Sequence, residues 1–200
     1  YGFAKPSGLA FINITNGELI FNTTLNISSV KEAFNINEEE LIIVGSREVI
    51  KVSVPEMRIE RKEIFGDVRD VMLVRNESGS IWAIAILQND TLAIYDIDTL
   101  AETYVLNASL ETLSIAQMNA TLTVILERNK IKIVGLKNKN IYKINLPVTL
   151  EKGKVIAING DKNRDGIIVI MGTTGWNGTI LTIDDSGVHT TILGWLDLCN

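Results

Sequence analysis

The chain alternates short apolar runs with short polar segments, and the pattern recurs along its length. The most apolar runs begin roughly 40 to 45 residues apart and are rich in Ile, Val and Leu; they are Glu40–Ser46, Ile81–Leu87, Thr121–Glu127 and Gly166–Gly172. Each is followed, after a short polar turn, by a second run: Glu48–Val54, Thr91–Asp98, Lys130–Lys137 and Thr179–Asp185. A third run follows each second one. A weaker run precedes each of the most apolar runs, most clearly at Asp70–Val74, Leu113–Met118 and Lys154–Asn159. The pattern predicts units of four short segments.

These segments are typical of β-strands, because they are short, rich in β-branched residues and bounded by Asn, Asp, Gly and Ser. Along Ile81–Leu87 both alternating sets of side chains are apolar, so we expect this strand to be buried on both faces. A four-stranded antiparallel unit of this length, covered on both faces by its neighbours, is a β-propeller blade. The sequence therefore predicts an all-β, β-propeller-like fold.

We expect four clear blades and a partial fifth, either as a single propeller domain or as a fragment of a larger propeller. The predicted blades are 31–66, 67–106, 107–148 and 149–194, with 1–30 and 195–200 as pieces of a fifth blade that the two chain ends share. Such sharing would close the ring without a free strand edge.

The segment Asp90–Leu106 resembles the broad class of propeller repeats, including WD-like and surface-layer-type repeats. Its Tyr95-Asp96 pair stands where a WD dipeptide would, although the other units have no aromatic–aspartate pair there. The resemblance implies a propeller, a fold that hosts enzymes, scaffolds and adhesive modules alike.

Composition excludes several classes of function. The formal net charge of -5 and the pI of about 5.0 argue against nucleic-acid partners, which need clustered Lys and Arg. No apolar run approaches the roughly 18 to 20 residues of a membrane-spanning helix, so we expect no transmembrane segment in this chain. With one cysteine, Cys199, and one histidine, His189, the chain cannot form an internal disulfide or a Cys/His zinc site. Cys199 is a candidate for an intermolecular contact, and a buried thiol is the alternative.

Eight Asn-x-Ser/Thr sequons occur, against about two expected from composition alone. They are Asn13, Asn22, Asn26, Asn76, Asn89, Asn107, Asn119 and Asn177. Several fall in predicted turns, where a bulky glycan can reach solvent. The alternative is that turns next to strands generate sequons by accident. N-linked glycans at these positions would place the chain outside the cell or at its surface.

The high Ile content and the presence of only two glutamines, Gln88 and Gln117, are typical of thermophiles, while the many asparagines are not. An archaeal N-glycosylated cell-surface protein would satisfy these observations together.

One loop carries a candidate metal site. Asp161, Asn163 and Asp165 precede Gly166 in the pattern D-x-N-x-D-G, in which alternate side-chain oxygens can converge on a calcium ion. The pattern resembles the calcium loops of EF-hands and integrin-type propellers, but Val169 and Gly172 stand where those families place a later carboxylate. The alternative is an ordinary Asn/Asp/Gly hairpin turn.

No convergent catalytic set is evident. The acid pairs at Asp96/Asp98 and Asp184/Asp185 are typical of charged turn ends, and His189 has no nucleophile elbow beside it. Trp176, in a Gly-rich loop, is a candidate exposed contact. We therefore expect a non-catalytic, N-glycosylated extracellular propeller that acts as a structural, adhesive or protein-interaction module. Its partners would be other surface proteins or copies of itself. The alternatives are an accessory or catalytic propeller of a secreted enzyme, with calcium, and an intracellular WD-like scaffold.

Overall fold

The computed structural model describes residues 8–12, 15–24, 27, 29–53, 56, 58–64, 66–136, 140–158, 167–175, 177–184 and 186–193. Every regular element within these ranges is a β-strand, and all strand pairs are antiparallel. Among these residues there is accordingly no helix that could span a membrane. The chain divides into two compact units, residues 1–68 and 69–200, which are treated separately below.

The first unit contains a hairpin and a four-stranded sheet. Strands β1 (Gly8–Ile12) and β2 (Leu19–Thr24) form the hairpin. The sheet follows chain order: β3 (Val30–Asn35), β4 (Glu40–Gly45), β5 (Glu48–Ser53) and β6 (Arg58–Glu63). Ile27, Ile43, Ile50 and Val52 form its apolar core.

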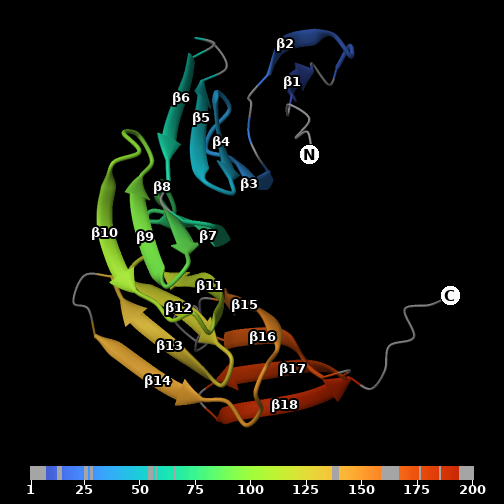
Figure 1. Ribbon diagram of the computed structural model, residues 1–200, viewed down its shortest axis with the longest axis vertical. Helices are drawn as coiled ribbons and strands as arrows, with labels where there is room; N and C mark the ends of the chain where they lie inside the picture. Colours follow the sequence, from blue (N-terminus) through green and yellow to red (C-terminus); the bar gives the residue numbers. More distant parts are fainter. Residues whose placement is uncertain are drawn as a thin grey trace, which may run out of the picture. The chain divides into compact units, whose positions relative to one another are not determined.

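The second unit contains three four-stranded sheets, each again in chain order (Figure 1). The first is β7 (Val68–Arg75), β8 (Ile81–Gln88), β9 (Thr91–Asp96) and β10 (Glu102–Asn107), and the unit boundary falls at the first residue of β7. The next is β11 (Thr112–Asn119), β12 (Leu122–Glu127), β13 (Lys130–Gly135) and β14 (Ile141–Asn145). The last is β15 (Lys152–Ile158), β16 (Ile167–Thr174), β17 (Asn177–Asp184) and β18 (Gly187–Leu193).

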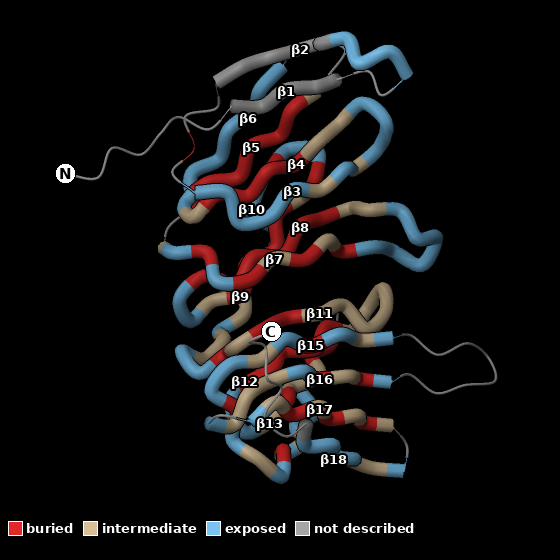
Figure 2. The backbone as a smooth tube through the Cα atoms, turned by 90° about the vertical axis from the view of Figure 1, so that its right-hand side faces the viewer, coloured by how far each residue is buried: buried red, intermediate tan, exposed pale blue. Residues whose placement is uncertain are grey.

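Burial follows the apolar pattern of the sequence. The middle strands are the most buried: β5 and β8 are mostly red in Figure 2, whereas the outer strand β10 is mostly pale blue. Residues Ala83 to Leu87 are all fully buried, which confirms that this strand is covered on both faces. The all-β prediction, with four antiparallel four-stranded sheets, is confirmed.

The core of the second unit lies between consecutive sheets. One cluster joins the β7–β10 sheet, through Met72, Val74 and Leu87, to Ile115 and Ile125 of the next sheet. A second cluster joins Val124 and Leu126 of that sheet to side chains of β15–β18, among them Val155, Ile168, Ile170, Leu181 and Ile183. Each sheet therefore stabilises its neighbour by burying one face against it.

Candidate functional site

The sequon asparagines that the structure describes in full lie at turns and strand ends. Asn76, Asn89, Asn107 and Asn177 are exposed, and Asn119 is half-buried. Asn13 and Asn26 lie outside the described residues, and Asn22 is in β2, whose side chains are not described. The five fully described asparagines all belong to the second unit.

Two of these asparagines hold their turns in shape through the side-chain oxygen. Asn76 Oδ1, in the β7–β8 turn, accepts hydrogen bonds from the Ser78 amide at 3.0 Å and the Ser78 hydroxyl at 2.6 Å. Asn119 Oδ1 accepts from the Thr121 amide at 2.9 Å and the Thr121 hydroxyl at 3.0 Å. In both sequons, therefore, the hydroxyl of the Ser or Thr donates a hydrogen bond to the side-chain oxygen Oδ1 of the asparagine. The nitrogen Nδ2, which would carry a sugar, makes no hydrogen bond to a described residue.

Asn89 has a different role in its turn. Its φ is 47°, in the left-handed region that asparagine tolerates better than most residues. Because Gln88 pairs with Thr91, Asn89 and Asp90 alone connect β8 to β9. Asparagine at the first position of this two-residue turn suits the left-handed conformation.

A hollow of the second unit lies beside the Asn76 turn. It encloses about 460 Å³ and is lined by Asn76, Glu77, Ser78, Trp82 and Ala120. Two smaller hollows, of about 380 and 310 Å³, share Asn76, Glu77 and Ala120 with it and add Asn119 to the lining. The three together form one grooved area, the rim groove, between the β7–β8 and β11–β12 turns.

Gln117 fixes the two walls of the rim groove to each other. Its Oε1 accepts from the Arg75 amide at 2.9 Å, and its Nε2 donates to the carbonyls of Arg75 at 2.6 Å and Asn119 at 3.0 Å. Trp82 forms the apolar part of the lining while packing against the core between the sheets. Sequence reasoning did not connect Trp82 with this rim and assigned Gln117 no role, because the contacts span some 40 residues.

A buried polar network joins the first strands of the three sheets in the second unit. Asp70 of β7 accepts hydrogen bonds at 2.8 Å from both the Ser114 hydroxyl and the Ile115 amide of β11. Ser114 Oγ in turn accepts from the Val155 amide of β15 at 3.3 Å, and Lys154 forms an ion pair with Asp70. The Asp70 carboxylate is therefore satisfied by protein groups.

Another buried carboxylate lies at the end of β12. Glu127 is 1% exposed and forms ion pairs with Lys130 and Lys132 of β13. Burial raises the pKa of this carboxyl, but the hydrogen bonds and charges of Lys132 and Lys130 outweigh that effect, so its pKa lies below the ordinary value.

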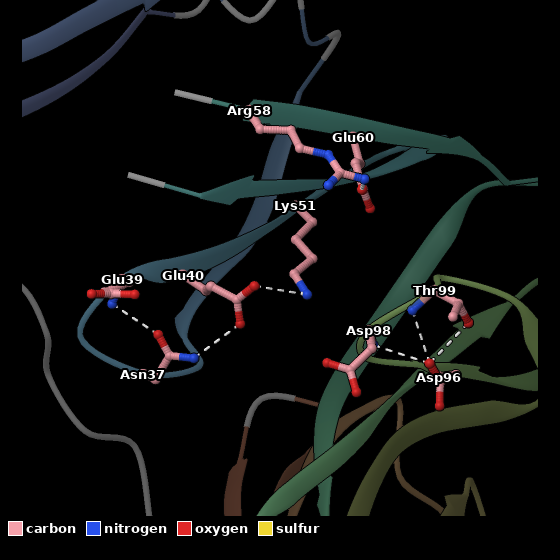
Figure 3. Close-up of polar contacts among 9 residues, drawn as sticks. All are labelled: Asn37, Glu39, Glu40, Lys51, Arg58, Glu60, Asp96, Asp98 and Thr99. Carbon is pink, nitrogen blue, oxygen red and sulfur yellow. Dashed lines mark hydrogen bonds and ion pairs between the residues drawn. The ribbon is translucent and has the colours of Figure 1, made fainter. Parts of the chain in front are cut away.

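The remaining acid clusters are used in local turns, two of which are drawn in Figure 3. In the first unit, Asn37 donates to Glu40 at 2.9 Å, and Glu40 pairs with Lys51 at 2.9 Å, whose hydrogen bond lowers the pKa of Glu40. In the second unit, Asp96 Oδ1 accepts from the amides of Asp98 at 3.0 Å and Thr99 at 2.8 Å. The aspartate at the WD-like position therefore caps the β9–β10 turn.

His189 lies on β18 beside two polar groups of the β17–β18 turn. Its Nε2 is 2.8 Å from the Ser186 hydroxyl and 3.4 Å from Asp184 Oδ1. Hydrogen bonds from Ser186 lower the pKa of Asp184. Because Ser186 and Asp184 face the same ring nitrogen, the arrangement is not the relay of a catalytic triad, in which acid and nucleophile face opposite nitrogens.

Several candidate residues cannot be placed. Asp161, Asn163 and Asp165 of the calcium-like loop lie outside the described residues, as do Trp176 and Cys199. Within the described ranges no three His, Cys, Asp or Glu side chains come together as metal ligands. The calcium prediction therefore stays a prediction.

Comparison with known proteins identifies the fold. No protein-family description matches the sequence, and no curated protein is similar to it. Solved structures do resemble it. The WD40 domain of SCAP from fission yeast matches with a TM-score of 0.61 and 15% identity, over 98% of this chain and 56% of that chain. Saccharomyces cerevisiae Sqt1 matches with a TM-score of 0.59 and 12% identity, over 93% and 65%. Kuenenia stuttgartiensis hydrazine synthase matches with a TM-score of 0.63 and 12% identity, over 80% and 48%.

The chain thus spans about half to two thirds of the length of these solved chains. At such low identity the likeness concerns the arrangement of strands alone. Together with the four antiparallel sheets, it confirms the prediction that the chain has a β-propeller fold.

Proposed function

We propose that the chain is a non-catalytic, N-glycosylated β-propeller that serves as a protein-interaction module at the cell surface. It would belong to a surface layer, a filament or an ectodomain, and its partners would be other surface proteins or copies of itself. An archaeal source remains part of the proposal on compositional grounds only.

The observation that carries the proposal is the placement of the sequons. Four of the five fully described asparagines are exposed, and all five lie at turns or strand ends, not within buried strands. A glycan needs an exposed attachment point because its polar surface must stay hydrated. Accidental sequons would also gather in turns, because asparagine is favoured there and depleted in strands, so the exposure of these asparagines permits glycosylation and the peptide measurement below decides between the two.

The non-catalytic assignment rests on how the acidic and basic groups are used. The Asp70 carboxylate is hydrogen-bonded to Ser114 and Ile115 and forms an ion pair with Lys154. The Glu127 carboxylate forms ion pairs with two lysines. His189 is exposed at a hairpin, away from the rim groove lining. The groove itself offers Glu77, amides, a hydroxyl and an indole, which are groups suited to binding.

Mass spectrometry of the protein from its native source tests the proposal. We expect glycopeptides at several of Asn76, Asn89, Asn107, Asn119 and Asn177. Asn129 is an internal control, because it is an exposed turn asparagine without a sequon and should carry no sugar. Ser78→Ala should remove the sugar at Asn76 while leaving the asparagine in place.

Unmodified peptides at all of these asparagines, in protein from the native source, would overturn the proposal. Sugar at Asn129 as well as at the sequons would show that the modification does not follow the acceptor motif, and would also count against it.

A further inference from the structure

The rim groove brings together three groups that no other described part of the chain engages. The Asn76 amide nitrogen Nδ2, the Glu77 carboxylate and the Trp82 indole Nε1 make no hydrogen bond or ion pair with a described residue. Trp82 is half-buried, because it packs on the apolar core between the sheets and also lines the hollow. A donor, an acceptor and an apolar ring therefore meet in one hollow, beside an asparagine that carries an acceptor motif.

This hollow forms entirely within the second unit. Its lining comes from the β7–β8 hairpin and, through Ala120, from the β11–β12 turn. Gln117 of β11 is hydrogen-bonded to both main-chain polar groups of Arg75 in β7, which holds the two walls together. All of these residues belong to the unit 69–200 and to two consecutive sheets, so the hollow depends on neither the first unit nor the chain ends.

The β7–β8 turn holds the Asn76 side chain in one orientation. Oδ1 accepts hydrogen bonds from the Ser78 amide at 3.0 Å, the Ser78 hydroxyl at 2.6 Å and the Ser80 amide at 3.0 Å. Main-chain bonds close the turn, from the Asn76 amide to the Ser80 carbonyl at 2.9 Å and from the Gly79 amide to the Asn76 carbonyl at 3.0 Å. Because Oδ1 is held against the turn, Nδ2 lies on the side of the amide away from these donors. The atom that would carry a sugar is thus held in a fixed direction.

A sugar ring matches the groups in the hollow. A pyranose has an apolar face of C–H groups that can lie on an indole ring, and its hydroxyl groups both donate and accept hydrogen bonds. Trp82 supplies the ring and an N–H donor, and Glu77 supplies an acceptor. The volume of about 460 Å³ is within the range of roughly 300–1,000 Å³ that is typical of small-ligand sites.

We infer that the first sugar attached to Asn76 packs on Trp82 inside the rim groove. There it bridges the β7–β8 hairpin and the β11–β12 turn, and so stabilises the contact between two sheets. Attachment keeps the sugar at a high effective concentration beside the indole, which favours even a weak contact. The inference rests on the proposed function, because it requires a sugar on Asn76, and it adds a structural role for that sugar within the same molecule.

The test is a double-mutant cycle on the full 200-residue chain, produced in a glycosylating host. Thermal unfolding compares the unmodified chain, Ser78→Ala, Trp82→Leu and the double variant. Ser78→Ala removes the acceptor motif at Asn76, and glycopeptide mapping shows which proteins carry the sugar. We expect the sugar to raise the thermal midpoint by about 2–4 °C when Trp82 is present and by less than about 1 °C in Trp82→Leu.

The same four proteins made in a host without N-glycosylation supply the baseline. Coupling between Ser78→Ala and Trp82→Leu in that series comes from the polypeptide alone and is subtracted. Trp82→Phe is a milder second variant, because it keeps an aromatic ring against the core; it should retain only part of the gain from the sugar. The proton resonance of the Trp82 indole N–H, identified as the signal lost in Trp82→Leu, should shift when Ser78→Ala removes the sugar.

Ser109→Ala is the matched control. It removes the acceptor motif at Asn107, an exposed asparagine at the end of β10 that is not part of the rim groove lining. Loss of a sugar at Asn107 should therefore change the thermal midpoint by the same amount in the presence of Trp82 and in Trp82→Leu.

The possible failures distinguish this inference from the proposed function. A sugar on Asn76 that raises the midpoint equally in the unmodified chain, Trp82→Leu and Trp82→Phe would overturn the inference alone. So would sugars on other sequons with none on Asn76, whereas peptides free of sugar at every sequon would overturn both. A gain that grows with protein concentration would place the sugar in the groove of a second molecule, and would also overturn the inference.

Discussion

Glu127 illustrates what a buried charge requires in this protein. Its side chain is almost completely buried, yet two lysines of the adjacent strand keep it ionised. An isolated carboxylate in such a place would be strongly disfavoured, so the stability of the carboxylate depends on its partners. The alternating lysines in Lys130–Gly135 therefore have a structural role on this side of the strand.

The sign of the Glu127 pKa shift predicts a pH dependence of stability. The pKa of the folded state lies below the ordinary value of 4.5, so the stabilising contribution of Glu127 is complete above about pH 5 and is lost as the pH falls through the folded pKa. Glu127→Gln should lower the free energy of unfolding near pH 7 by about 1–3 kcal/mol. The free energy of unfolding of this variant should also fall less steeply as the pH is lowered. Urea unfolding between pH 7 and pH 3 measures both effects.

Glu111→Gln is the control, because Glu111 is exposed in the turn before β11. In this variant the free energy of unfolding should fall with decreasing pH as steeply as in the unmodified chain. An unchanged acid decline in Glu127→Gln would contradict the role assigned to the ion pairs.

At the level of elements, Asp70 connects three strands that are far apart in sequence. Asp70→Ala would leave the Ser114 hydroxyl and the Ile115 amide buried without their acceptor. We expect a loss of about 2–4 kcal/mol in the free energy of unfolding, measured in urea. Asp70→Asn should cost less, because an amide oxygen can still accept both bonds.

The control for this prediction is Asp67→Ala. Asp67 pairs with Arg47 at 3.3 Å, but the two side chains are 71% and 73% exposed. Exposed ion pairs contribute little, so the change should stay within about 0.5 kcal/mol. Equal losses of unfolding free energy in Asp67→Ala and Asp70→Ala would show that the buried network stabilises the fold no more than an exposed ion pair does.

Gly172 in β16 has no side chain, and this allows its backbone to lie close to the Lys152 backbone of β15 and to the Leu150 side chain. A Cβ at Gly172 would lie 2.7 Å from the Lys152 carbonyl oxygen and 2.9 Å from a Leu150 methyl group. Alanine would otherwise stabilise a strand relative to glycine, so the contact decides the sign. Gly172→Ala should lower the thermal midpoint, at a cost of about 1–3 kcal/mol.

Gly153→Ala is the matched comparison on the adjacent strand. Its Cβ would meet leucine methyl groups at 3.1 and 3.3 Å, which can shift more easily than a backbone oxygen. Gly153→Ala should therefore lower the thermal midpoint less than Gly172→Ala does. A larger decrease in Gly153→Ala would contradict the packing described for Gly172.

For the whole molecule, the sequence predicted the strands and their grouping into sheets because both depend on local patterns. The strand at Ile81–Leu87 was recognisable from its unbroken apolar run, and the turn at Asn89 from its turn chemistry. Tandem repetition then implied stacked sheets, since no single unit could bury its own apolar faces.

The polar contacts between sheets could not be predicted in the same way. Asp70, Ser114 and Lys154 are separated by about 40 residues at each step, and only the strand register brings them together. Aligning the repeats shows that all three occupy the third position of their strands. That alignment is the signal that sequence reasoning could have used.

The rim groove has a consequence for how the molecule is prepared. Two of its lining residues, Asn76 and Asn119, are sequon asparagines, so sugars there would stand in the hollow that Trp82 and Glu77 line. If the proposed sugars are present, protein made in a host that lacks the modification would expose a surface that the sugars of the native molecule would cover. Ligands found with such material would need to be tested again on the sugar-bearing form, because partial occupancy would make a native sample a mixture of open and closed molecules.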